Sequence, residues 1–191
     1  MDFSTDYLVA LNEFESLEND HKQPYLFAFL GYALYLSQNL EKHLLNVIWA
    51  HKVANRTNES SEELSSFFDD WETKKPTMGK LINTVLEILD LTSEDSKKIE
   101  ALLKKRNFIV HHYFVLNNKL LYATEGYKVI IRDFVQFINS LNELESKLTY
   151  FTYSYLEKFG LNKEDVKSEI EKETDLWASL YIDESYCGFD Y

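Results

Sequence analysis

A six-residue stretch in the middle of the chain carries side chains that could act on a phosphate group. It contains Arg106, Asn107 and His111. An imidazole exchanges a proton near neutral pH, and a guanidinium binds phosphate or carboxylate through its planar fork. The stretch therefore predicts general acid/base chemistry next to a bound anion, with Asn107 as an orienting group, or else an ion pair that serves the fold.

Arg106 lies within the apolar stripe of a helix that we expect over residues 94–114. At 100° per residue, the apolar side chains on one side of this helix are Ile99, Leu102, Leu103, Ile109, Val110 and Tyr113. The chain has only three arginines against seventeen lysines, so Arg106 looks selected for its fork. An unpaired charge there would be costly. Two structural alternatives remain open, because the side chain could extend out of the seam or hold a carboxylate such as Glu41.

The two adjacent histidines are not interchangeable on this helix. His111 is four residues from Asn107 on one face, whereas His112 projects about 100° further round. Tyr113 falls about 20° from Arg106, two turns along, and is expected to border the same cleft or to be a core residue. We expect no metal, because neighbouring histidines point to different faces and lack a ligand partner at helical spacing. The remaining histidines are expected to be surface or satisfied helix residues: His21, His43 and His51.

Apolar spacing predicts helices along most of the chain. The expected helices cover about 6–17, 24–54 (starting at Pro24), 63–71, a stretch that follows the Lys75-Pro76 break and ends near 89, and 94–114. Thr92 and Asp95 open the last of these as in a capping box. Residues 114–123 contain an Asn-Asn pair and indicate a short hairpin or a loop. A helix over 125–159 shows a coiled-coil-like seam and stops at Gly160. The seam residues are Phe137, Leu141, Leu144, Leu148, Phe151 and Tyr155.

Composition favours one all-α domain of helical-bundle type. The chain has 191 residues, of which 45% are hydrophobic, and only five glycines and two prolines are available for turns. We expect a main domain over 1–160. An additional C-terminal helix, capped by Asn162, and an acidic aromatic tail make up 161–191, packed on the same domain.

Charge and cysteine content limit the environment and the partners. A formal net charge of −12 disfavours broad adhesion to nucleic acid, so any such contact must be local. The acidic N-terminus is unlike a signal peptide, and the longest nearly apolar run, residues 25–36, is too short to cross a membrane. The only cysteine, Cys187, cannot form an internal disulfide. These features predict a cytoplasmic protein.

The segment R-N-F-I-V-H-H-Y, from Arg106 to Tyr113, resembles the R-N-x-x-x-H-x-Y signature of HEPN domains. The resemblance covers roughly residues 25–156, including the helix that begins near Met78 and precedes the motif helix. The doubled histidine and the acidic C-terminal extension depart from the pattern. The resemblance implies a HEPN-type bundle and a homodimer that packs two motif helices into one cleft.

Within such a dimer, the resemblance implies a metal-independent endoribonuclease without a cofactor, acting as a toxin or phage-defence effector. His111 would be the general acid/base and Arg106 would stabilise the transition state, with Asn107 orienting and Glu41 as a speculative fourth member. In related toxins the motif tyrosine, here Tyr113, receives AMP from a partner nucleotidyltransferase that acts as antitoxin. The alternative function is a non-catalytic HEPN module that binds a protein or a nucleotide.

Overall fold

The computed structural model describes residues 6–55, 73, 76–89, 91–123, 125–158, 160–165, 167–168 and 171–172. All regular elements in these ranges are helical, as expected for an all-α chain. They are α1 (Tyr7–Ser16), α2 (Asn19–Ala54), α5 (Met78–Ile88), α6 (Ser93–His111), α7 (Tyr113–Asn117), the 3₁₀ turn η1 (Asn118–Leu121) and α8 (Gly126–Lys158). The expected helix over 63–71 lies outside the described residues.

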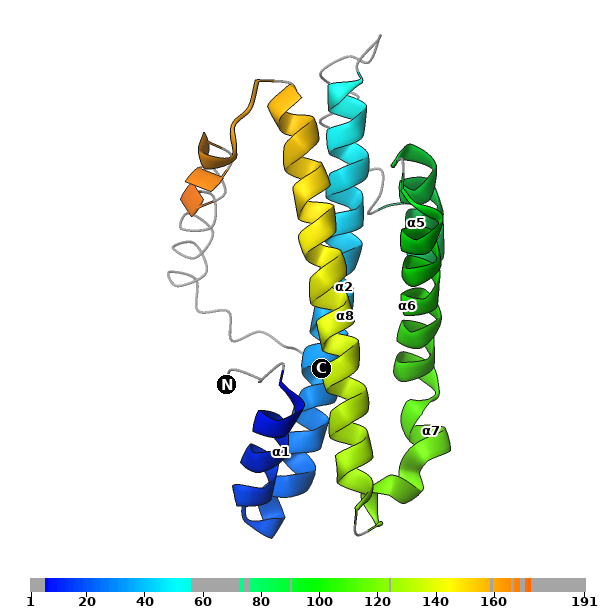
Figure 1. The fold of residues 1–191 in the computed structure, drawn as a ribbon, viewed down its shortest axis with the longest axis vertical. Coiled ribbons are helices and arrows are strands. Elements are labelled where there is room, and N and C mark those ends of the chain that lie inside the picture. The colour runs from blue at the N-terminus through cyan, green and yellow to red at the C-terminus, as the bar shows by residue number, and fades with distance from the viewer. Residues whose placement is uncertain are drawn as a thin grey trace.

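Two long helices, α2 and α8, form the axis of the bundle. They contain 36 and 33 residues, lie side by side and make the most extensive contact in the fold. Figure 1 shows α5 and α6 along one side of this pair and α1 against its lower half. The rise of a helix makes each of the two about 50 Å long. The pair is therefore the frame against which α6, with its candidate site residues, is placed.

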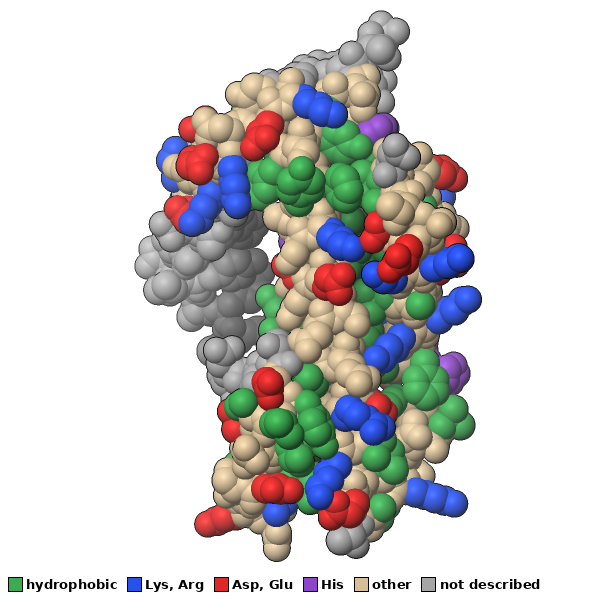
Figure 2. Space-filling model, viewed as in Figure 1, with side chains coloured by type: hydrophobic (Ala, Val, Ile, Leu, Met, Phe, Trp, Pro, Cys, Tyr) green, Lys and Arg blue, Asp and Glu red, His purple; other side chains and the backbone are tan. Residues whose placement is uncertain are grey.

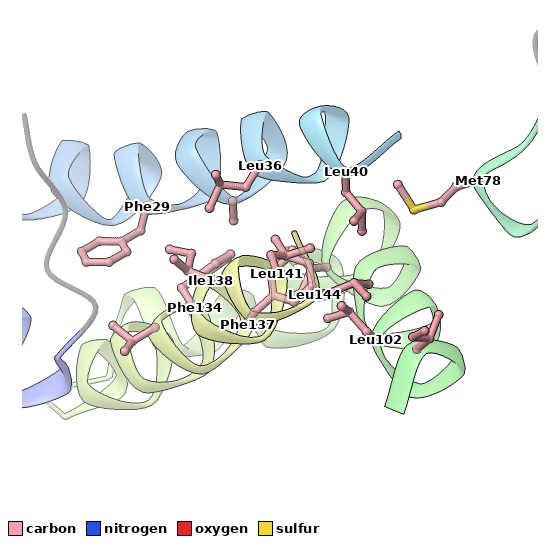
Figure 3. Close-up of a cluster of buried hydrophobic side chains, with 14 of the residues drawn as sticks. Phe29, Leu36, Leu40, Met78, Leu102, Phe134, Phe137, Ile138, Leu141 and Leu144 are labelled. Atoms are coloured by element: carbon pink, nitrogen blue, oxygen red, sulfur yellow. The ribbon is translucent and has the colours of Figure 1, made fainter. Parts of the chain in front are cut away.

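The core is a continuous row of apolar side chains between α2 and α8, closed by α5 and α6. Figure 3 shows how side chains from the four helices meet. The labelled members are Phe29, Leu36, Leu40, Met78, Leu102, Phe134, Phe137, Ile138, Leu141 and Leu144. The predicted seam of α8 is confirmed, because its residues from Phe137 to Leu148 are buried and the last two, Phe151 and Tyr155, pack against the core.

Side-chain and backbone caps set several helix ends as the sequence predicts. The Thr92 hydroxyl oxygen accepts the Asp95 N–H at 3.1 Å and begins α6. Gly160 has a φ of 85°, and the N–H groups of Gly160 and Leu161 donate to the carbonyls of Glu157 and Leu156. This is the Schellman arrangement that ends α8.

The next helical stretch also begins at its predicted residue. The Asp165 N–H donates to Asn162 Oδ1 at 2.8 Å, as expected for the residue that caps the C-terminal helix. Residues 163–165, 167–168 and 171–172 are helical. The rest of the predicted C-terminal helix and the acidic tail lie outside the described residues.

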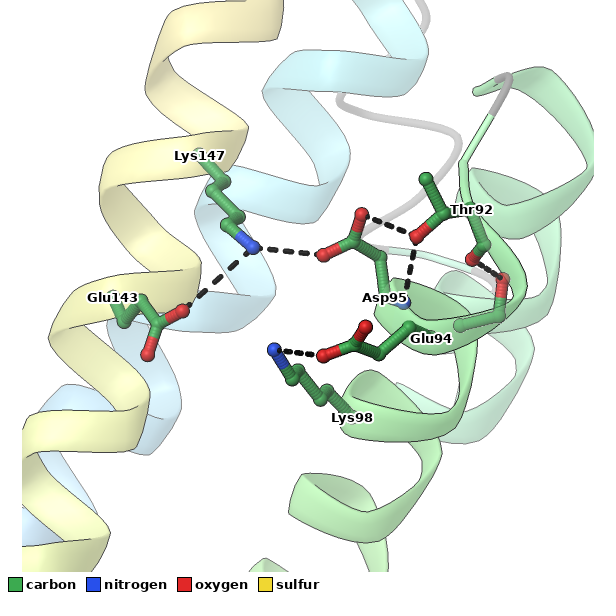
Figure 4. A network of polar contacts seen from close by, with 7 residues as sticks. Thr92, Glu94, Asp95, Lys98, Glu143 and Lys147 are labelled. Carbon is green, nitrogen blue, oxygen red and sulfur yellow. Dashed lines mark hydrogen bonds and ion pairs between the residues drawn. The ribbon is translucent and has the colours of Figure 1, made fainter.

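The N-terminus of α6 is fastened to α8 by a network of charged side chains. Lys147 of α8 donates to Asp95 at 2.8 Å and lies 3.7 Å from Glu143, while Lys98 pairs with Glu94 at 2.8 Å. Figure 4 shows Lys147 reaching from α8 to the first turn of α6. Acidic residues in that turn also interact favourably with the helix dipole.

Three boundary predictions are wrong. Helix α2 begins at Asn19 rather than at Pro24, so the proline lies inside the helix, near its start. The short hairpin suggested for 114–123 is absent, because α7 and η1 occupy residues 113–121. The helix expected to continue to residue 114 ends at His111, where His112 takes φ −131° and ψ −19°.

Within the described residues, no helix has the length and apolar character needed to span a bilayer.

Candidate functional site

Arg106 projects from α6 toward α2, where Glu41 meets it. One guanidinium nitrogen, Nη2, lies 3.3 Å from Glu41 Oε1, and Nη1 donates to Asn107 Oδ1 at 3.2 Å. The Arg106 side chain is 20% exposed and that of Glu41 is 38% exposed. The pair is thus only partly removed from water. Of the two structural alternatives left open for Arg106, the structure shows the pair with Glu41.

The guanidinium nevertheless retains unused hydrogen-bonding capacity. Its Nε atom is buried and has no hydrogen-bond partner among the described residues. Buried Leu102 and Ile109 lie on the same side of α6, one turn before and about one turn after the arginine. Glu41 and Asn107 thus each engage one Nη atom and fix the direction of the guanidinium, while its Nε atom stays enclosed.

The two histidines stand exposed at the end of α6. Their rings are 6.2 Å apart, and the His112 N–H closes the helix by donating to the Phe108 carbonyl at 2.8 Å. Neither imidazole makes a hydrogen bond or an ion pair in the part of the chain that the structure describes. Both rings are therefore accessible to a substrate or to a second chain.

Arg106 and His111 do not face the same side of one chain. Five residues of α6 separate them, which is about 7.5 Å along the axis and about 140° around it. Arg106 faces α2, whereas exposed Asn107 and His111 lie on the outer face. The structure thus brings together Arg106, Asn107 and Glu41, and leaves His111 at the surface beside them.

Tyr113 lies in the core rather than at the edge of an exposed cleft. It is 3% exposed, and its hydroxyl donates to Asp133 Oδ2 of α8 at 3.0 Å. Burial raises the pKa of the Tyr113 hydroxyl above its usual value, and the nearby Asp133 charge adds to this effect. The expected position two turns after Arg106 on one helix is wrong, because α6 ends at His111 and Tyr113 begins α7.

Exposed apolar side chains surround the histidines, a feature that the sequence reading missed. Phe108 is 37% exposed, Val115 75% and Leu116 68%. We call Phe108, Val115 and Leu116 the α6–α7 patch. Figure 2 shows hydrophobic side chains and a histidine together on the surface where α6 gives way to α7. The apolar run after His112 could have indicated this exposed surface, but it was interpreted as part of a hairpin.

A second missed signal is the local charge. Residues 101–124 contain no Asp or Glu in a chain that has 32 of them, yet they include Lys104, Lys105, Arg106 and Lys119 as well as both adjacent histidines. We call residues 101–124 the basic island of this acidic chain; within it, the charge of Arg106 is paired with Glu41 of α2. A polyanion would meet less repulsion here than elsewhere.

Other histidines have ordinary roles. His43 lies 3.0 Å from Glu145, and the His51 ring packs edge-on against Tyr155, where burial lowers its pKa. Among the described residues, the one cluster spaced to hold a metal ion is Glu18, Asp20 and His21, all exposed at the start of α2. It includes none of the candidate site residues.

Comparison of the chain with protein-family models, with curated proteins and with solved structures found no match.

Proposed function

We propose that this protein is a metal-independent endoribonuclease of HEPN type, with an active site completed by a second copy of the chain. The observation that carries the proposal is the Arg106 fork. Glu41 and Asn107 hold it, its Nε atom has no partner among the described residues, and unpaired His111 follows within two turns of α6. A guanidinium and an imidazole are the groups that cleavage of a phosphodiester without a metal requires.

The need for two copies follows from the helix geometry. Because Arg106 and His111 point about 140° apart, one chain does not focus both on the same phosphate. A two-fold axis near the end of α6 would bring two arginines and two histidines to one cleft. The α6–α7 patch supplies exposed apolar surface for such an interface, and the basic island around it would receive RNA.

In the proposed reaction, the ribose 2′-oxygen attacks the adjacent phosphorus and the bond to the 5′-oxygen breaks. One His111 takes the 2′-hydroxyl proton, and the His111 of the second copy gives a proton to the departing 5′-oxygen. Arg106 stabilises the negative charge on the pentavalent phosphorus, while Asn107 orients the fork. The products are a 2′,3′-cyclic phosphate and a 5′-hydroxyl, and no metal ion takes part.

The cellular role that we propose is that of a toxin or defence effector, on the strength of the motif resemblance. A partner nucleotidyltransferase could act as antitoxin, but attachment of AMP to Tyr113 has a structural requirement. The hydroxyl is buried against Asp133, so α7 would have to move away from α8 before the oxygen could react. An antitoxin would therefore bind a partly opened form of the protein.

The decisive test compares His111→Ala with His112→Ala on single-stranded RNA in the presence of EDTA. Both side chains are exposed and adjacent, so His112→Ala is a matched control for folding and for local charge. We expect wild type and His112→Ala to leave cyclic-phosphate ends, and His111→Ala to lose at least a hundredfold in rate. Cleavage that needs magnesium, or equal loss in both variants, would refute the assignment.

The dimer is tested separately by light scattering. Val115→Asp should give a monomer that cuts no RNA, whereas Tyr150→Asp, at an exposed site on α8, should remain dimeric and active. A wild-type monomer at micromolar concentration would remove the shared site. If wild type then also fails to cut RNA, the non-catalytic binding module becomes the better interpretation.

A further inference from the structure

A groove between α6 and α8 lies apart from the residues of the proposed active site. Its volume is about 370 Å³, within the range of small-molecule pockets. It runs along α6 from Asp95 to Lys105, a length of about 15 Å at the helical rise. Arg106, Asn107 and His111 are not among the residues that line it. The groove is therefore a second candidate site.

The groove is apolar along its length and charged at its rim. Its apolar lining includes Ala101 and Leu102 of α6 and Leu144, Leu148 and Phe151 of α8. Figure 2 shows acidic and basic side chains along the line where α8 and α6 meet. Such a surface would gain free energy by covering its apolar part with a ligand tail, at about 25 cal/mol for each Å² removed from water.

Most of the rim charges are already compensated. Lys147 forms ion pairs with Asp95 and Glu143, and Lys98 forms one with Glu94, as Figure 4 shows. These pairs lie at the end of the groove nearest the first turn of α6. Two lysines face three carboxylates there, so this end keeps one net negative charge and does not attract an anionic group.

Lys105, at the opposite end, lacks such a partner. It makes no hydrogen bond or ion pair with any described residue, and its ammonium lies 5.9 Å from the centre of the Phe137 ring. The nearby carboxylate, Asp133, is engaged by the Tyr113 hydroxyl at 3.0 Å and lies 3.7 Å from Arg132 Nε. Burial lowers the pKa of Lys105, and Asp133 opposes this only in part.

From this arrangement we infer that the groove binds a small amphipathic monoanion, a medium-chain fatty carboxylate. The carboxylate pairs with Lys105, and the alkyl tail lies over Leu102, Leu144 and Leu148 toward Phe151. A single uncompensated cation selects one negative charge, whereas the carboxylates of Asp95 and Glu143 would repel the additional charges of a nucleotide. The volume suits a small molecule better than a partner helix, which is about 10 Å across.

The experiment titrates decanoate into the full-length protein, with isothermal calorimetry for affinity and amide NMR shifts for location. Lys105→Met keeps the aliphatic stem and removes the charge, and Lys104→Met is its control because Lys104 is exposed and does not line the groove. Ala101→Phe fills the groove from an exposed position on α6. Decanol serves as the uncharged ligand.

We expect wild type and Lys104→Met to bind decanoate with equal affinity, with shifts at Ser140 and Phe151. Lys105→Met should weaken decanoate about tenfold or more and leave decanol unchanged, because a hydrogen bond to a charged group is lost. Ala101→Phe should abolish both. Circular dichroism confirms that each variant is folded.

Three results would overturn the inference. The first is no decanoate binding at millimolar concentration, and the second is equal binding of decanol and decanoate by wild type. The third is a change of oligomeric mass in Ala101→Phe, which would make the groove an interface between copies. The first two results do not bear on RNA cleavage, whereas the third would also contradict the α6–α7 patch as the interface of the proposed dimer. Cleavage by wild type in EDTA, measured separately, distinguishes failure of the groove proposal from failure of the proposed function.

Discussion

The contact between Arg106 and Glu41 predicts an asymmetric response to mutation. The atoms are 3.3 Å apart, which at an effective dielectric constant of about 20 is an attraction of about 5 kcal/mol before desolvation. Exposed pairs retain about 0.2–1 kcal/mol of such an attraction, and breaking a fully buried pair costs about 3–5 kcal/mol. Exposures of 20% and 38% lie between these limits, so we expect a coupling of about 1–2 kcal/mol.

The more buried partner determines the asymmetry. Glu41→Gln leaves a largely buried guanidinium with a weaker acceptor and should destabilise the protein by about 2 kcal/mol. Arg106→Met keeps an apolar stem in the α2–α6 seam, while the more exposed Glu41 turns to water, so the loss should be below about 1 kcal/mol. The double variant should resemble Arg106→Met.

Urea unfolding at neutral pH and one fixed protein concentration measures these differences, since a dimer makes stability concentration-dependent. Each kcal/mol should also move Tm by about 2–4 °C for a chain of this size. Glu94→Gln, at the exposed Lys98 pair, is the control and should destabilise the protein much less than Glu41→Gln does. A larger loss in Arg106→Met than in Glu41→Gln would refute the reasoning, because Glu41 would then be the partner that needs the pair.

Three further substitutions test the local structure by the same urea assay. Tyr113→Phe should cost about 1 kcal/mol, because Asp133 loses the hydrogen bond from the Tyr113 hydroxyl. The raised pKa of Tyr113 keeps the folded phenol protonated, so wild type loses stability as the pH rises above 10 and the unfolded phenol ionises. Tyr113→Phe lacks this group and should lose less stability than wild type over that range. Gly126→Ala should cost about 2 kcal/mol, because its Cβ would lie 2.0 Å from the Leu120 carbonyl oxygen; an unchanged midpoint would mean that η1 moves freely. Thr92→Ala should cost about 1 kcal/mol through the lost cap of α6, and Thr92→Ser, which restores the oxygen, should recover most of it.

The features that the sequence determined by itself are local ones. Thr92 and Asp95 cap α6 and Gly160 ends α8, because each depends on residues only a few positions apart. The seam of α8 follows from a repeat within one helix. For Arg106 the sequence left two alternatives open, extension out of the seam or a pair with a carboxylate such as Glu41, and the packing of α6 against α2 selected the second. RNA cleavage, the dimer and the antitoxin remain predictions.

Tertiary packing decided what local patterns left open. Residues 114–121 show no clear hydrophobic period. They form the helix α7 and the 3₁₀ turn η1 instead of a hairpin, and the Phe114 ring packs against Phe27 and Phe134. Likewise, α2 extends before Pro24, where Tyr25 packs against Phe29 and bonds to Glu13. The outcome at 114–121 depends on partners far along the chain, which no local window contains, whereas the start of α2 involves its neighbour α1 and its own next turn.

The break at His112 has the largest consequence for the candidate site. The chain leaves the axis of α6 there, and Tyr113 packs against Phe134 and donates to Asp133. A continuous helix would have kept Tyr113 in line with Arg106. The motif residues are adjacent in sequence, but burying an aromatic ring and pairing its hydroxyl on α8 placed Tyr113 in the core and left His111 at the surface.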